Sequence, residues 1–269
     1  MTVLNDEVIR ALNERDWPDY VVERLGARVG DAVAPTLRPA VGRKRIDKVT
    51  VGCSKFGGLP DVDSTFRWPT EDDTDEPLAL VCQLRLAEAG PASGGVLPST
   101  GMLYLFCIYD GDRAYGYEID NGTAKVVHVP DPGPLARAPR PDGLGDEGVF
   151  REQPFVLLPS LVTEELDEDD GQPAHARFDA SVEDAIDEVL GATGNGYTGS
   201  LRMLGNAHLW REETQDSFDM GTQTLLLYVS GWDVDQAAFG EGDFNLIIDN
   251  ADLAAGRLGS VDIVYSPGT

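Results

Sequence analysis

The sequence predicts a mainly β (α+β) fold in which internally duplicated antiparallel sheets pack together, with a few peripheral helices. Three observations lead to this prediction. Short apolar runs separated by Gly, Pro and Asp recur from about residue 33 to the end of the chain, as is typical of strands. A similar pair of such runs occurs in each half. Apolar residues at helical spacing are confined to a few short segments.

Helices are predicted in two places. Residues 1–32 contain two short stretches of apolar residues at helical spacing, with Trp17-Pro18 between them as a suitable helix start. Residues 181–190 form the third helix, because Ser181 and Asp184 make a start like a capping box and Gly191 follows the last apolar residue. The helix at 181–190 and the Pro-, Gly- and acid-rich loop at 130–148 connect the two halves.

The predicted strands are apolar runs bounded by turn residues. They are 48–52, 78–86, 102–109, 114–119, 124–129, 201–204, 224–232, 244–249 and 261–265.

A repeated pattern relates the two halves. In each half an apolar strand is followed by a loop, a glycine and a second apolar strand. The glycines are Gly101 and Gly242, which are 141 residues apart (242 − 101). We therefore predict one domain over 33–269, made of two similar β units at about 33–130 and 195–269 and preceded by the helices of 1–32.

The charge of the chain excludes several partners. The 269 residues contain 21 Lys and Arg against 47 Asp and Glu, a formal net charge of −26. Such a surface repels nucleic acid and anionic membranes, so we expect neither as a direct partner. A basic protein is the partner that the charge favours. Adaptation to high salt or a GC-rich genome is the alternative, since only four of the cations are lysine.

The chain is expected to be cytoplasmic. Its longest apolar run, 102–109, is far shorter than the ~20 residues of a membrane span, and its start lacks the pattern of a signal peptide. Cys53, Cys82 and Cys107 are odd in number and widely spaced, which indicates reduced thiols rather than disulfides. The three histidines are scattered, so neither a metal nor another cofactor is predicted.

One segment stands out as a candidate binding site. Lys55 and Phe56 precede the paired glycines Gly57 and Gly58, and a tryptophan follows at Trp68. A cation, an aromatic ring and a flexible turn together are able to bind a small anion or sugar.

Gln83 completes this candidate set, because an amide within an apolar strand needs hydrogen-bond partners and the glycine turn is the nearest source. The structural alternative is a turn that packs its aromatic residues into the core. Ligand binding requires that Lys55 Nζ and the Trp68 face be open to solvent on a concave surface.

No set of residues meets the requirements of catalysis, and the protein is interpreted as a non-enzyme. The glycines of 194–199 follow a predicted helix, whereas a dinucleotide site needs a strand before them. Cys53 is a weak candidate nucleophile. The acids Asp61 and Asp63, near Trp68, resemble the carboxylate pair of a glycosidase, but solvation at the surface is the simpler interpretation.

The order and spacing of several short motifs resemble a known family. They are Ser54-Lys55-Phe56-Gly57-Gly58-Leu59-Pro60, Trp68-Pro69, Pro77-Leu78, Gln83-Leu84, Leu97-Pro98, Gly101, Leu103-Tyr104 and Phe106. This pattern resembles the YwqG-like (DUF1963) family, a bacterial family of unknown function, over nearly the whole chain from about residue 33. The resemblance implies a mainly antiparallel β fold with internally repeated sheets and peripheral helices, and it implies no established activity.

The sequence therefore favours a non-catalytic binding or interaction protein, and an immunity-type protein that neutralises a basic toxin is the specific hypothesis. An enzyme or binding protein for a small polar ligand at Lys55 to Trp68 is one alternative. An acidic DNA mimic is another. The oligomeric state is not predicted.

Overall fold

The computed structural model describes residues 33–39, 49–109, 119–163, 201–204, 219, 221–231, 234, 239 and 242–266, of which 33–39, 92 and 158–163 are described by backbone alone. The chain divides into two compact units. The smaller consists of Met1–Thr36 and Pro159–Thr198, and the larger of Leu37–Leu158 and Gly199–Thr269. The candidate site lies in the larger unit.

The described elements are mostly strands. In chain order they are β1 (Val33–Pro39), β2 (Lys55–Phe56), β3 (Asp61–Val62), β4 (Ala79–Arg85), α3 (Leu86–Ala92), β5 (Met102–Cys107), β6 (Ala124–Val129), β7 (Ala136–Arg137), β8 (Gln153–Pro154), β9 (Leu157–Thr163), β10 (Leu201–Met203), β11 (Gln223–Ser230), β12 (Asp243–Asp249), α8 (Asn250–Ala254) and β13 (Val261–Ser266). Neither described helix is long or apolar enough to cross a bilayer.

The strands form three sheets. Their orders are β13-β12-β11-β10-β1-β9, β6-β5-β4-β2-β8 and β3-β7. Every strand pair whose register the structure describes is antiparallel. The prediction of a mainly β fold built from antiparallel sheets with few helices is therefore confirmed.

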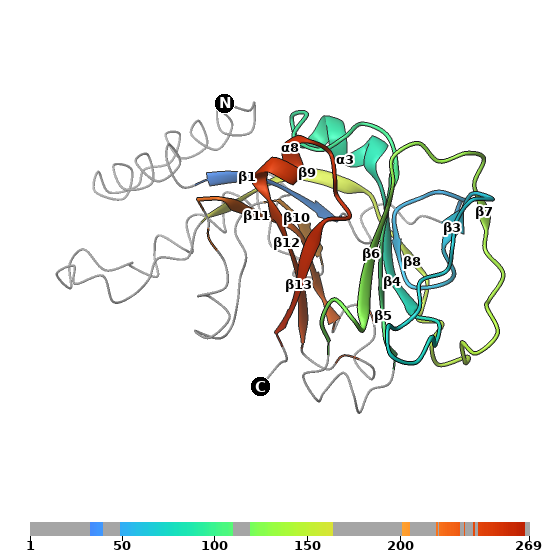
Figure 1. Cartoon of the computed structure of the whole chain (residues 1–269). Helices are drawn as coiled ribbons and strands as arrows, with labels where there is room; N and C mark the ends of the chain where they lie inside the picture. Colours follow the sequence, from blue (N-terminus) through green and yellow to red (C-terminus); the bar gives the residue numbers. More distant parts are fainter. Residues whose placement is uncertain are drawn as a thin grey trace, which may run out of the picture. The chain divides into compact units, whose positions relative to one another are not determined.

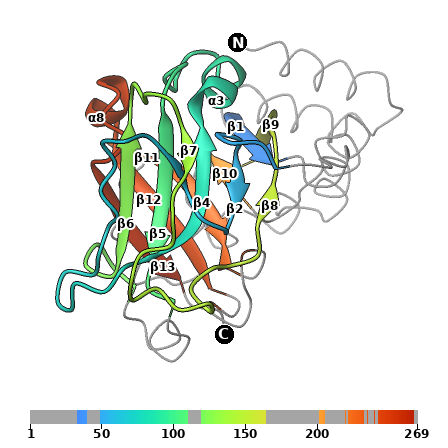
Figure 2. The same cartoon turned by 90° about the vertical axis from the view of Figure 1, so that its right-hand side faces the viewer.

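Within the larger unit, two sheets face each other across one hydrophobic core. Leu103 and Leu105 of β5 share this core with Phe244 and Leu246 of β12, and all four side chains are buried. Figures 1 and 2 show the sheet of β10 to β13 as one layer and the sheet of β2, β4, β5, β6 and β8 as the next. Strands β3 and β7 lie on the far side of the second sheet (Figure 1).

The outer face of the second sheet is covered by the chain between β2 and β4. Phe66 packs on Tyr104 and Phe106, with ring centroids 5.7 and 6.1 Å away. Trp68 adds an edge contact to Phe106 at 5.8 Å and donates its indole N–H to the Leu78 carbonyl at 2.9 Å. Trp68 is therefore half-buried in an aromatic cluster.

The two large sheets have the same strand register. Pairing of β4 with β5 skips Val81, and pairing of β11 with β12 skips Leu226, which lies 145 residues later (226 − 81). The partner strands are offset by 141 residues (243 − 102) and the outermost strands, β6 and β13, by 137 (266 − 129). Three successive strands thus pair in the same way in each sheet.

The correspondence extends to a fourth strand. Lys55 of β2 pairs with Gln83, and Arg202 of β10 pairs with Tyr228 at the matching position. Gly57 and Leu204, which follow these strands, both have a positive φ, +56° and +63°. Each donates its N–H to the skipped residue of the neighbouring strand, Val81 at 3.0 Å and Leu226 at 3.3 Å.

Several predicted elements differ from the structure. The run at 48–52 is not a strand in its described part, 49–52, because the chain turns there and Gly52 has a φ of +81°. Strands β1, β8 and β9 were not predicted, since their sequences, rich in Pro and of mixed polarity, lack alternation. The helices predicted in 1–32 and 181–190 and the strand predicted at 114–119 lie outside the described residues.

Candidate functional site

Three residues of the candidate region lie in one row across the second sheet. Lys55 pairs with Gln83, and Gln83 pairs with Tyr104. Residues directly opposite each other in a sheet point to the same face, so these three side chains share one face. All three are fully or almost fully buried.

The paired glycines fold the chain back over this row. Gly57 and Gly58 have φ values of +56° and +71°, a conformation that costs other residues about 1–2 kcal/mol. A Cβ atom at position 57 would lie 2.5 Å from the Arg151 carbonyl oxygen, and one at position 58 would lie 2.9 Å from Glu152 Oε1. Only glycine therefore allows this turn to approach the chain before β8.

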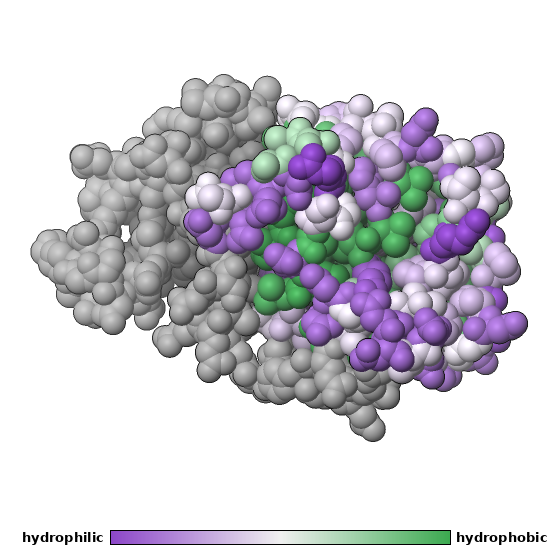
Figure 3. Space-filling model, viewed as in Figure 1, coloured by the Kyte–Doolittle hydropathy of each residue, from purple (hydrophilic) through white to green (hydrophobic). Residues whose placement is uncertain are grey.

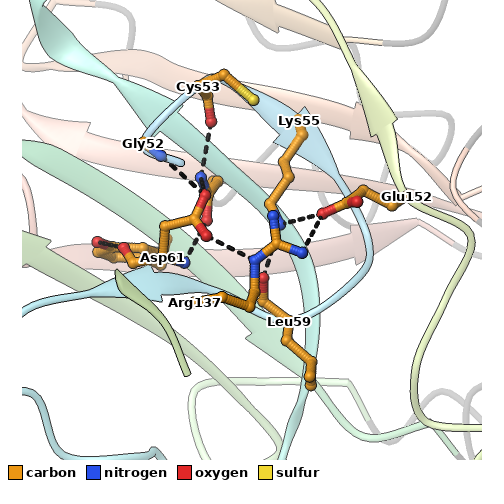
Figure 4. Close-up of polar contacts among 9 residues, drawn as sticks. Gly52, Cys53, Lys55, Leu59, Asp61, Arg137 and Glu152 are labelled. Carbon is orange, nitrogen blue, oxygen red and sulfur yellow. Dashed lines mark hydrogen bonds and ion pairs between the residues drawn. The ribbon is translucent and has the colours of Figure 1, made fainter. Parts of the chain in front are cut away.

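The turn carries Asp61 onto the row, where every polar group of this buried residue has a partner. Its N–H donates to Gln83 Oε1 at 2.8 Å, and its carbonyl accepts from the Tyr104 hydroxyl at 2.7 Å. Its carboxylate accepts from Gly52 N and Gln83 Nε2, both at 2.9 Å, and from Arg137 Nε at 2.6 Å (Figure 4). Interpretation of Asp61 as a solvated surface acid is therefore wrong.

Lys55 enters the same network from the side. Its Nζ donates to the Leu59 carbonyl at 2.6 Å and to Glu152 Oε1 at 2.5 Å, and the side chain is 0% exposed. Arg137 Nη1 contacts the same Glu152 oxygen at 2.8 Å. Figure 4 shows the Arg137 guanidinium between the two carboxylates. Two cations and two anions thus form a neutral chain, Lys55–Glu152–Arg137–Asp61.

This arrangement ties the covering layer to the sheet. Buried charges are tolerated when they are paired and fully hydrogen-bonded, and removal of one partner leaves another charge uncompensated. Gln83 contributes in the same way, because its Nε2 also donates to the Cys53 carbonyl at 2.7 Å. The expectation that Gln83 bonds the backbone near the glycine turn is met by Cys53 and Asp61, which flank it.

The structure brings five of the six predicted site residues into the same region of the sheet. Phe56 packs in the core against Phe155, with ring centroids 4.8 Å apart, while Lys55, Gly57, Gly58 and Gln83 belong to the turn and its network. Trp68 belongs to the aromatic cluster described above. Lys55 Nζ does not face solvent, so the condition set for direct ligand contact by this ammonium is not met.

Asp61 makes stability depend on pH in a defined direction. Burial raises its pKa, but hydrogen bonds from Arg137, Gly52 and Gln83 outweigh burial, and the pKa is lowered overall. A depressed folded-state pKa contributes stability above the unfolded pKa of ~3.9, and this contribution is lost as the pH falls below that value.

We therefore expect Asp61→Asn to be less stable than the natural protein from pH 7 down to about pH 4, with the difference shrinking below pH 4. Urea unfolding at several pH values measures this. A difference that grows as the pH falls below 4 would contradict the assignment.

The remaining candidate nucleophile is poorly suited to its role. Burial raises the pKa of the partly buried, unpaired Cys53 thiol, so little thiolate forms at neutral pH. Burial also raises the pKa of Cys82 to about 12. Ser54 donates to Glu88 at 3.0 Å and accepts from the Arg85 N–H, so its hydroxyl connects β2 to α3.

Sequence reasoning missed Arg137 and Glu152. Both lie in segments without hydrophobic periodicity, more than 75 residues from their partners in the chain. No local signal marks such residues. Within the part of the chain that the structure describes, no group of three or more His, Cys, Asp or Glu side chains is placed to hold a metal ion.

A comparison with family models places this chain. Residues 54–265 match the model described as "Domain of unknown function (DUF1963)". The chain belongs to this family. The match begins one residue before Lys55 and ends at Tyr265 of the last strand, so the DUF1963 domain contains the whole charge network and both large sheets. The comparison with curated proteins returned no match.

Proposed function

We propose that this DUF1963 protein is a non-catalytic binding protein whose partner is a basic protein. The observation that carries the proposal is the charge of the layer over the second sheet. Segments 61–76 and 119–147 contain twelve acidic side chains and four Lys or Arg. The exposed acids are Asp72, Asp73, Asp75, Glu76, Asp120, Asp131, Asp142, Asp146 and Glu147.

These carboxylates are concentrated on the loops of one layer, and the hydrophilic residues around them are visible in Figure 3. Among the exposed acids, Asp72 pairs with Lys125 and Asp146 with Arg140. A surplus of one sign on one surface steers a partner of the opposite sign and raises its association rate. The buried charge network holds the loops that carry the acids, and its own charges are neutralised inside the protein.

In this proposal the partner is a toxin neutralised by an immunity-type protein, or another basic protein that ordinarily binds DNA. Both offer clustered Lys and Arg to the acidic layer. Binding takes place in the cytoplasm, where Cys53, Cys82 and Cys107 stay reduced. A small ligand at Lys55 to Trp68 is less well supported, because the Lys55 ammonium is held by Leu59 and Glu152.

The proposal also includes an origin for the two large sheets by duplication of one β unit. The shared register of four strands, with the skipped residue at the same place, supports it. So does the positive φ of Leu204 at the position of Gly57, since a leucine adopts this conformation only at a cost. The functional consequence is that the covered face of one sheet has a counterpart in the other.

Reversal of one exposed charge tests the acidic layer. The protein is immobilised, basic proteins captured from a cell lysate are purified, and their association rates are measured. We expect Asp73→Lys to reduce the association rate constant about 3–10-fold at low salt, with a smaller effect at high salt. Asp249→Lys makes the same change in net charge at an exposed position on β12 and should change the rate less than about twofold.

Equal effects of the two variants would show that the acidic layer is not the contact surface. Failure to capture any basic protein would overturn the proposed function. Competition by duplex DNA would identify the partner as a DNA-binding protein, because both ligands then use the same basic surface.

A further inference from the structure

A buried amide on the first sheet has no hydrogen-bond partner. Asn245 of β12 is 0% exposed, and neither its Nδ2 nor its Oδ1 makes a hydrogen bond. On the next strand, Ser266 is 1% exposed, and its hydroxyl also makes none. Burial of polar atoms without partners is unfavourable, and nearly all buried polar groups in folded proteins are satisfied. Unsatisfied groups at a binding site are the exception, because the ligand supplies the missing partners.

Asn245 points away from the core between the two sheets. Its neighbours in the chain, Phe244 and Leu246, belong to that core, and side chains alternate along a strand. Ile247, on the same face as Asn245, belongs instead to a separate small cluster with Leu225 and Tyr228. The unsatisfied amide therefore lies on the outer face of its sheet.

The matching face of the other sheet shows what such a position binds. Tyr104 corresponds to Asn245 through the 141-residue offset of β5 and β12. Tyr104 donates to the Asp61 carbonyl at 2.7 Å, and Gln83 accepts the Asp61 N–H at 2.8 Å. On that sheet, the row is occupied by the backbone amide groups of the chain itself.

On the first sheet, the row consists of Arg202, Tyr228 and Asn245. The guanidinium of Arg202 lies over the Tyr228 ring, 5.5 Å from its centroid. Asp243, two residues from Asn245 on the same face, is 3% exposed and brings the opposite charge. Because one cation and one anion share this face, it does not select an ion.

We propose that Asn245 is the recognition residue of a second binding site, which takes an uncharged ligand bearing an amide group. Asn245 Nδ2 donates to the ligand carbonyl, and Asn245 Oδ1 accepts the ligand N–H. The Ser266 hydroxyl provides a third polar contact. This site is independent of the proposed function, because it lies on the other sheet and binds a neutral group rather than a basic protein.

Side-chain amide NMR of the ¹⁵N-labelled full chain tests the ligand. The Asn245 NH₂ signals are those that disappear in Asn245→Leu. We expect acetamide or N-acetyltrialanine amide, at millimolar concentration, to shift them saturably, while methyl acetate, which lacks an N–H, does not. Saturation by acetamide identifies a small carboxamide as the ligand, and saturation by the peptide alone identifies a peptide chain. If neither shifts these signals, or all three do so equally, the proposal is overturned.

Thermal unfolding of two matched variants provides a second test. Asn245→Leu removes an unsatisfied amide, so we expect it to raise Tm by about 2–4 °C. Tyr104→Phe removes a hydroxyl that is bonded at the corresponding position, so we expect it to lower Tm by a similar amount. A lowered Tm or loss of folding in Asn245→Leu would show that the amide holds the fold together, and would overturn the proposal.

Discussion

Replacing Asp61 with alanine is expected to lower the free energy of unfolding by about 3–5 kcal/mol. The carboxylate is fully buried and accepts hydrogen bonds from Arg137, Gln83 and Gly52. Its removal leaves the Gly52 N–H without its partner, deprives Gln83 Nε2 of one acceptor and leaves the Arg137 charge with Glu152 alone. A buried donor without a partner carries its full desolvation cost.

Urea unfolding followed by tryptophan fluorescence measures this loss, with Asp63→Ala as the control. Asp63 lies two residues away and also accepts backbone hydrogen bonds, from Thr65 and Gly133, but at an exposed site. We expect Asp63→Ala to cost about 1 kcal/mol or less. A cost for Asp61→Ala no greater than that of the control would show that the charge network does not hold the covering layer.

Gly57→Ala is expected to cost about 3 kcal/mol or more. A positive φ costs a residue with a side chain about 1–2 kcal/mol, and here the added Cβ also lies 2.5 Å from the Arg151 carbonyl and 2.9 Å from that of Phe150. The backbone must shift to relieve these contacts. Such a shift moves the segment that carries Glu152 away from Lys55.

Gly95→Ala separates the two contributions. Gly95 has a φ of +89°, and a Cβ there would meet no atom within 4 Å, so this variant tests the conformation alone. We expect it to cost about 1–2 kcal/mol. If both variants unfold at the same urea concentration, the close approach of the Gly57 turn to residues 150 and 151 is not important for stability.

The central strands were predictable because their pattern is local. The run at 78–86 became β4 (Ala79–Arg85), and the run at 124–129 became β6 with the same limits. Six of the seven residues of β4 are buried, which is why a nearly continuous apolar run encodes this strand. The short strands β2, β3, β7 and β8 have two residues each and carry no periodic signal.

The candidate region was also predictable in part. Lys55, the glycine pair and Gln83 stand out because a cation, positive-φ residues and an amide are unusual around buried strands. Their role was not predictable, because it depends on Arg137 and Glu152, which come from segments with no pattern of their own. Lys55 was a candidate for ligand contact until its ion pair was seen.

By itself, the sequence determined the family, the mainly β fold, the central strands and the need for a hydrogen-bond partner at Gln83. These follow from local patterns, because alternation, turn residues and the polarity of a side chain are properties of neighbouring residues. The tertiary structure alone decided which strands pair and which charges meet. β1 lies within the predicted first unit but pairs with β10, and β8 pairs with β2 across about 97 residues (Phe56 with Gln153). Long-range pairing depends on the complementarity of two distant segments, and neither segment alone encodes it.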